Sequence, residues 1–237
     1  MKIQRWALIL VGVVVLVAFS AGAALAAQGV AAAARGIGGA RQPAVVAELT
    51  PAEAAGLLLM REEEKLAHDV YVTLYDQRNL SIFQRIANSE SAHTSAVKTL
   101  LDRYGLTDPV GDNAVGVLEN DELQALYDQL VAQGSASLEG ALRVGAAIEE
   151  IDILDLQEEM ALTDKADILR VYQNLLNGST SHLRAFVSTL ERQTGEAYEP
   201  QYMTQAAYEG IIGASSGGNG GRGGGNGGGN GGGRGGR

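Results

Sequence analysis

Apolar residues recur at alternating steps of three and four between Leu49 and about Ile212, which is the spacing of helices that bury one face. The segment is rich in Leu, Ala, Glu and Gln, and its prolines stand at the edges (Pro51, Pro200) and in one loop (Pro109). This pattern predicts an all-α domain with four long helices and a short one.

Capping residues indicate where the first two helices begin and end. The first is predicted to start after Thr50, with Pro51 in its first position and Glu53 in its first turn, and to run to about residue 77. The second is predicted to be capped by Ser81 and to end at Gly105, a glycine in the usual C-terminal position.

The remaining helices follow a loop rich in Gly, Asp and Asn. We predict a short helix at about 120–133 that Gly134 stops, and long helices at about 137–162 and 164–193, the last of them ended by Gly195. The residues after Gly195 are predicted to pack back as an extended strap and one helical turn.

Very short connections join the first long helix to the second and the third to the fourth, so each couple should form an antiparallel hairpin. The segment 105–134 then connects the two hairpins. The prediction is a ferritin-like four-helix bundle made of two antiparallel helical hairpins, with a crossover that contains the short helix.

The two ends of the chain differ in composition from this domain. Residues 1–26 combine Lys2 and Arg5, an apolar run and small residues before Ala27, which predicts a cleaved signal peptide. A secreted or cell-envelope protein is therefore expected, with no stable membrane span after cleavage; an uncleaved membrane anchor is the alternative.

Ala and Gly dominate residues 27–47, which predicts a linker before the helical domain 48–212. Residues 213–237 form a glycine-rich tail with Asn and Arg, predicted to be disordered and to act as a spacer or surface-adhesion segment.

The excess of acidic residues restricts the classes of molecule that the protein is expected to bind. The chain of 237 residues has a formal net charge of -10 and no cysteine, so disulfides are excluded. No nucleic acid partner is expected, because phosphate binding draws on clustered Lys and Arg. The oligomeric state is open, and a homodimer is compatible with the sequence.

Polar residues interrupt the core stripe of the second long helix. Stepping by three and four residues gives Ile86, Glu90, His93, Val97, Leu100 and Tyr104. Isolated ionised groups on such a stripe would cost several kilocalories in desolvation, and a bound cation is the simplest partner for both Glu90 and His93.

The other three long helices carry similar interruptions. The same stepping places His182 in the stripe of the fourth helix and Glu149 in that of the third, with Glu150 as an open alternative, and either Glu63 or Glu64 in that of the first. Each alone is more simply a solvated charge, a core histidine or an exposed acidic face. Four of them at comparable height in one bundle predict a metal site.

The runs "REEEKLAHDVY", "IANSESAHTSAVKTLLDRYGLTDPV", "GAAIEEIDILDLQ" and "VYQNLLNGSTSHLRAF" closely resemble the ferritin-like family catalogued as domain of unknown function 2202. The resemblance covers roughly Leu49 to Ile212 and implies a di-metal carboxylate bundle more firmly than an activity.

Related ferritins and rubrerythrins take a Glu, followed seven residues later by a Tyr, from one helix and Glu-x-x-His from the next. The resemblance implies Glu64 with Tyr71 for the first element and Glu90 with His93 for the second. In the second hairpin it implies Glu149, with Asp152 as an additional acid, and His182.

The sequence departs from this scheme at Ser179, where a second bridging glutamate is expected. Asp152 or Glu150 could replace it, the second metal position could be weak, or the site could hold one ion. His68 is a further candidate ligand, with an outer or surface position as the alternative.

The predicted cofactor is a pair of iron or manganese ions, because the ligands are oxygen and nitrogen without thiolate. Such a centre would act on oxygen, peroxide or ferrous iron, and Tyr71 and Tyr172 could tune it or serve only as core residues. The alternative function is a non-catalytic helical-bundle binding or structural module of the cell envelope.

Overall fold

The computed structural model describes residues 48–214, and these form six helices and no strands. The predicted signal peptide and linker, and the predicted glycine-rich tail from residue 215 onward, lie outside the described residues, whereas Gly213 belongs to the last helix. Within the described part, no helix is both long and apolar enough to cross a membrane. The six helices and the lack of strands in residues 48–214 confirm the all-α prediction.

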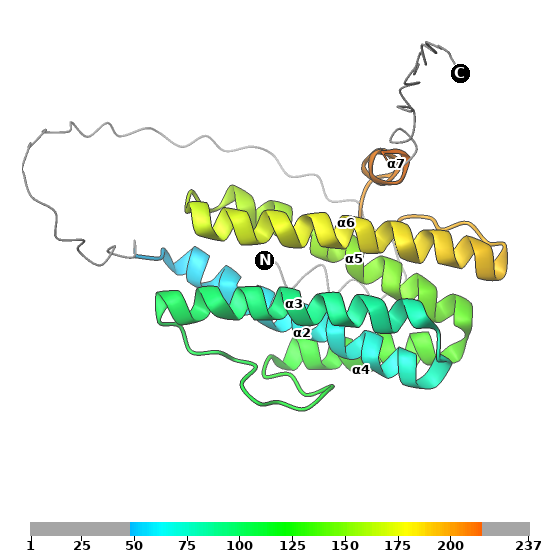
Figure 1. Cartoon of the computed structure of the whole chain (residues 1–237), viewed down its shortest axis with the longest axis horizontal. Helices are drawn as coiled ribbons and strands as arrows, with labels where there is room; N and C mark the ends of the chain where they lie inside the picture. The colour runs from blue at the N-terminus through cyan, green and yellow to red at the C-terminus, as the bar shows by residue number, and fades with distance from the viewer. Residues whose placement is uncertain (1–47, 215–237) are drawn as a thin grey trace, which may run out of the picture.

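Four long helices lie side by side (Figure 1). Their bounds are α2 (Pro51–Arg78), α3 (Ser81–Tyr104), α5 (Leu138–Ala161) and α6 (Ala166–Thr194). Packing is most extensive between α2 and α3 and between α5 and α6, and further contacts join α2 to α5 and α3 to α6. Each long helix therefore has two long neighbours around a shared interior.

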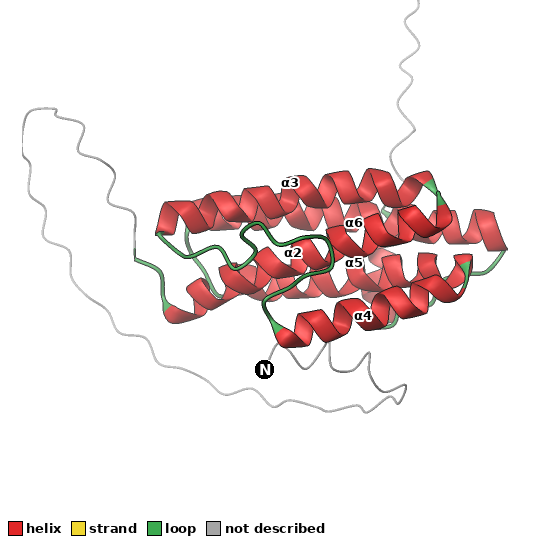
Figure 2. Cartoon of the chain, turned by 90° about the horizontal axis from the view of Figure 1, so that it is seen from below, coloured by secondary structure: helices red, strands yellow, loops and turns green. Residues whose placement is uncertain are grey.

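The short helices lie outside this group. Helix α4 (Asp121–Ala136) packs against α2 and α5, and the crossover loop before it runs along the bundle (Figure 2). Helix α7 (Gln205–Gly213) begins after a Thr204 cap and touches α6. It is longer than the single turn predicted.

Several predicted helix ends are confirmed. Thr50 and Glu53 form a reciprocal capping box with Pro51 at the start of α2, and Gly105 and Gly195 end α3 and α6 with φ of 70° and 78°. Positive φ is the conformation in which glycine has no steric cost.

Two predicted ends are wrong. The N-cap of α3 is Leu80, without a side-chain hydrogen bond, and Ser81 is already helical. Gly134 does not stop α4, which continues to Ala136. A Cβ at Gly134 would lie 2.7 Å from Leu74 Cδ2, so this glycine serves the close approach of α4 to α2.

The charge run 61–65 in α2 is buried, so its interpretation as a solvated face is wrong. Arg61 forms an ion pair with Asp108, and Lys65 donates to Ala114 O and pairs with Asp69. The carboxylate of Glu62 accepts from the backbone N–H of residues 119 and 120. These side chains fasten the crossover loop to α2.

The apolar core consists of two clusters. The larger contains Leu66 to Leu74 of α2 and Leu183 to Leu190 of α6, and the smaller contains Leu57 and Met60 of α2 with Tyr172 and Leu175 of α6. On α2, α3 and α6, acids and histidines lie between the stretches of helix that belong to these two clusters.

Candidate metal centre

Five of the six predicted site residues converge between the four long helices. They are Glu64 on α2, Glu90 and His93 on α3, Glu149 on α5 and His182 on α6. Their ligand atoms form two groups, each within 4.8 Å: Glu64, Glu90 and His93 in one, and Glu90, Glu149 and His182 in the other. We call these the first and the second position.

His93 lies at the first position between two carboxylates. Its Nδ1 atom is 2.7 Å from Glu90 Oε2 and 3.2 Å from Glu64 Oε2. The other oxygen of Glu64, Oε1, is buried and has no hydrogen-bond partner in the described part of the chain. The first position therefore has two acids and one imidazole nitrogen directed at a common space.

His182 occupies the corresponding place at the second position. Its Nδ1 atom is 2.7 Å from Glu90 Oε1 and 3.5 Å from Glu149 Oε2. The close approach of His182 Nδ1 to Glu90 Oε1 lacks hydrogen-bond geometry, and neither atom has another such partner among residues 48–214. This arrangement suits atoms that share a third partner better than atoms bonded to each other.

Glu90 joins the two positions, because each of its oxygens faces a different histidine. The two imidazole rings stack beside it with centroids 5.6 Å apart. Residues 90 and 93 are one turn apart on one face of α3, as the core stripe predicted. Helical spacing therefore explains why the Glu90 carboxylate and the His93 ring lie together.

The burial of the acids creates the electrostatic demand of the site. Glu64, Glu90 and Glu149 are only 1%, 2% and 2% exposed. The three carboxylates outnumber the two imidazoles of the cluster. Ion burial costs several kcal/mol per group unless opposite charges compensate it, so ionisation of all three acids calls for positive charge beyond the two rings.

Ionisation of the histidines follows from these neighbours. Burial alone would lower the pKa of His93, but Glu64 and Glu90 outweigh it and raise this pKa to about 11. Burial opposes charge on His182 too, and Glu149 and Glu90 raise its pKa to about 10. Both rings are cationic at neutral pH when no metal ion is bound.

The acids respond in different directions. Burial raises the pKa of Glu64 well above its usual value, and Asp152 adds to the increase. Burial also raises the pKa of Glu149. Contacts with both histidines overcome burial at Glu90 and hold its pKa at about 2, so the shared carboxylate stays ionised.

Asp152 lies beside the cluster without joining either position. Its carboxylate accepts a hydrogen bond from the hydroxyl of Ser179, the buried residue at the position where the ferritin-like resemblance implied a glutamate. Burial and the charge of Glu149 raise the pKa of Asp152 to about 8. Of the two proposed substitutes for the missing glutamate, Asp152 is the one near the site.

Glu150 points away from the cluster, although it neighbours Glu149. It is fully buried and accepts hydrogen bonds from the Tyr198 hydroxyl, at 2.6 Å, and from the backbone N–H of residues 201–203. Its role is to fasten the strap that follows α6. The idea that Glu150 completes the metal site is not supported by this placement.

His68 and Tyr172 are also placed outside the cluster. His68 Nδ1 is 2.8 Å from Asp69 Oδ1 and the ring lines a hollow of about 220 Å³ between α2, α3 and the crossover loop. Tyr172 packs in the smaller apolar cluster. Neither belongs to the two positions.

Three further residues surround the cluster. Tyr71 donates to Glu149 Oε1 at 2.6 Å, Ser89 Oγ is 3.0 Å from His182 Nε2, and Gly178 lies against His93. The resemblance suggested Tyr71, whereas Ser89 and Gly178 were missed. A glycine in the middle of a long helix was a signal, because glycine weakens a helix unless close packing requires it.

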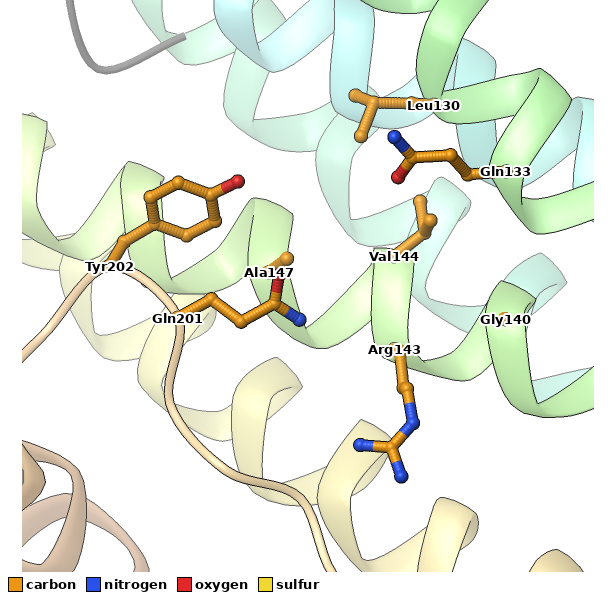
Figure 3. A pocket seen from close by; sticks show the side chains of 8 residues that line it. All are labelled: Leu130, Gln133, Gly140, Arg143, Val144, Ala147, Gln201 and Tyr202. Carbon is orange, nitrogen blue, oxygen red and sulfur yellow. The ribbon is translucent and has the colours of Figure 1, made fainter. Parts of the chain in front are cut away.

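A second hollow, of about 210 Å³, lies between α4, α5 and the strap (Figure 3). Leu130, Val144 and Ala147 line it together with Gln201 and Tyr202 of the strap. Its lining lacks the acids and histidines of the cluster.

Comparison with known proteins agrees with the sequence resemblance at the level of the family. Residues 53–215 match the family described as uncharacterized protein domain DUF2202. The uncharacterized protein MJ0754 of Methanocaldococcus jannaschii is 49% identical over 164 residues, covering 69% of this chain and 88% of that protein. The crystal structure of the hypothetical protein MJ0754 matches with a TM-score of 0.69 at 46% identity, covering 73% of this chain and 98% of that one.

The family match spans more than half of the chain, and the relative is similar along most of its own length. The chain therefore belongs to the DUF2202 family.

Proposed function

We propose that this protein is a ferritin-like metal-binding protein with a centre for two iron or manganese ions. Glu90 would contribute to holding both ions, Glu64 and His93 would complete the first position, and Glu149 and His182 the second. Asp152 would be the sixth group of the site. The observation that carries the proposal is the shared Glu90, whose two oxygens each lie 2.7 Å from a different histidine nitrogen.

The fit of the site to cations rests on the donor atoms themselves. Glu64 Oε1, Glu90 Oε1 and His182 Nδ1 are buried atoms without hydrogen-bond partners within residues 48–214. Such atoms are costly in an apolar interior, and a cation between them would remove the cost. Four long helices supply these donors from a rigid framework.

Donor chemistry supports the proposed identity of the ions. Carboxylate oxygen and imidazole nitrogen without thiolate suit iron and manganese, although zinc and copper also bind such donors when available. A pair of iron or manganese ions held this way would supply redox chemistry toward dioxygen, peroxide or ferrous iron. We propose a reaction of this class, with electrons from outside the chain, which has no cysteine.

The place of action is a separate proposal. Residues 1–26 have the composition of a cleaved signal peptide, so we propose a secreted or cell-envelope protein. Fractionation of the native host would test this independently of metal binding.

The central experiment measures Fe²⁺ binding by the metal-free full chain under anaerobic conditions, followed by exposure to oxygen or peroxide. We expect two ions per chain and an oxygen-dependent absorbance change. Glu90→Gln should abolish binding of at least one ion, because the carboxylate that both positions share loses its charge.

The matched control is a pair of neighbouring buried acids on α2. Glu64→Gln should weaken the first position, whereas Glu63→Gln should leave it unchanged, since only Glu64 belongs to the cluster. Wild-type protein that takes up no Fe²⁺ would refute the proposal. Tight binding without reaction toward oxygen, peroxide or Fe²⁺ would support the alternative of a structural module that a metal stabilises.

A further inference from the structure

Ser89 and Glu90 are consecutive residues of α3, and they contact opposite nitrogens of one imidazole ring on α6. Glu90 Oε1 is 2.7 Å from His182 Nδ1, and Ser89 Oγ is 3.0 Å from His182 Nε2. The ring is therefore held on both sides by a single turn of the neighbouring helix.

The two nitrogens of a neutral imidazole have different roles, because one carries a hydrogen and the other a lone pair. A hydroxyl oxygen accepts a hydrogen bond from Nε2–H, and this leaves the lone pair on Nδ1, the nitrogen that faces Glu90 and Glu149. A hydrogen-bond partner on the far nitrogen of a histidine ligand fixes its tautomer and its orientation.

His93 has no such partner in the described part of the chain. Its Nδ1 faces Glu64 and Glu90, while its Nε2 edge lies against Gly178, where an added Cβ would be 2.6 Å away. The ring at the first position is thus placed by the shape of α6, and the ring at the second position by a hydrogen bond that it donates to Ser89 of α3.

We propose that Ser89 is a positioning residue for His182. Through this ring, Ser89 increases the metal affinity of the second position and leaves that of the first unchanged. This inference rests on the proposed metal-binding function. It makes the two positions distinguishable: loss of the Ser89 hydroxyl should weaken one ion selectively, although Ser89 touches neither ion.

The experiment titrates the metal-free full chain with Mn²⁺ and counts the free ion by electron paramagnetic resonance. In Ser89→Ala, we expect one of the two ions to bind about 10- to 100-fold more weakly, which is the usual effect of removing an outer partner of a histidine ligand. The other ion should bind as in the wild type. Ser89→Thr, which keeps a hydroxyl, should restore binding to within a few fold.

Two controls separate positioning from general damage to the helix. Ser91→Ala lies two residues further along α3, is exposed and should leave both affinities unchanged. In a His182→Ala background, Ser89→Ala should have no further effect on Mn²⁺ binding, because Ser89 acts through that ring.

The outcomes distinguish this inference from the function on which it rests. If Ser89→Ala binds both ions as tightly as the wild type, the role of Ser89 is overturned and the metal centre is not. The same holds if Ser89→Ala loses as much affinity in the His182→Ala background as it does in the wild type. Failure of the wild type to bind Mn²⁺ would instead overturn the metal centre as well.

Discussion

Replacement of Gly178 by alanine gives the sharpest separation of metal binding from folding. A Cβ at this position would lie 2.5 Å from Cε1 and 2.6 Å from Nε2 of His93. Carbon atoms in favourable contact are about 3.5 Å apart or more, so the ring would have to retreat by roughly 1 Å. Metal–ligand distances tolerate only about 0.2 Å.

The effect of Gly178→Ala on stability should be small, because two contributions oppose each other. Alanine favours the helix by about 1 kcal/mol relative to glycine, while overpacking a buried site costs about 1–3 kcal/mol. We expect a net change between no effect and a loss of about 2 kcal/mol in the unfolding free energy of the metal-free protein. Binding at the first position should weaken by roughly 100-fold or more, since a direct ligand is displaced.

The assay pairs urea denaturation of the metal-free chain with Mn²⁺ titration. Gly210→Ala in α7 is the matched control, because a Cβ there meets nothing within 4 Å. It should stabilise slightly and leave Mn²⁺ binding unchanged. If Gly178→Ala binds both ions as tightly as the wild type, His93 is not a ligand held against α6 and the reasoning fails.

Three further predictions concern the surroundings of the cluster. Tyr71→Phe should destabilise the metal-free protein by about 1.5–3 kcal/mol in urea denaturation, because the buried carboxylate of Glu149 loses a donor at 2.6 Å; an unchanged midpoint would contradict this. Glu150→Gln should cost about 3 kcal/mol, since the strap loses a charged acceptor, yet Mn²⁺ binding should persist; loss of binding would mean that Glu150 supports the centre directly. The folded-state pKa values of His93 and His182, about 11 and 10, lie above the ordinary histidine value of 6.5, so their contribution to stability is complete below pH 6.5 and is lost as pH rises through 10 to 11. Thermal unfolding of the metal-free protein at a series of pH values measures this loss, and a His93→Gln/His182→Gln variant should lack the corresponding slope.

The sequence was informative where local chemistry decides the outcome. Thr50, Gly105 and Gly195 marked helix ends because caps depend on nearby residues alone. The core stripe brought residues 90 and 93 to one face, and the structure places them with Glu149 and His182. Their role as metal ligands stays a prediction.

Features that depend on distant parts of the chain were not visible. Gly134 looks like a helix stop until Leu74 is seen against it. Periodicity alone could not separate Glu149 from Glu150, because both are buried and only the strap at 198–203 shows which way each points. The charge run of α2 looked solvated because its partners, Asp108 and the backbone at 114–120, lie in a loop of no regular pattern.

The division of the apolar interior into two clusters has a consequence for how the protein unfolds. Each cluster consists of different buried side chains, and the charged residues between them contribute little hydrophobic stabilisation that would couple the two clusters. Ions at mid-height would tie all four long helices together, so that the halves melt as one unit. After a chelator has removed the ions, amide hydrogens should exchange first at the end of the domain that contains the smaller cluster, around Leu57 and Leu175.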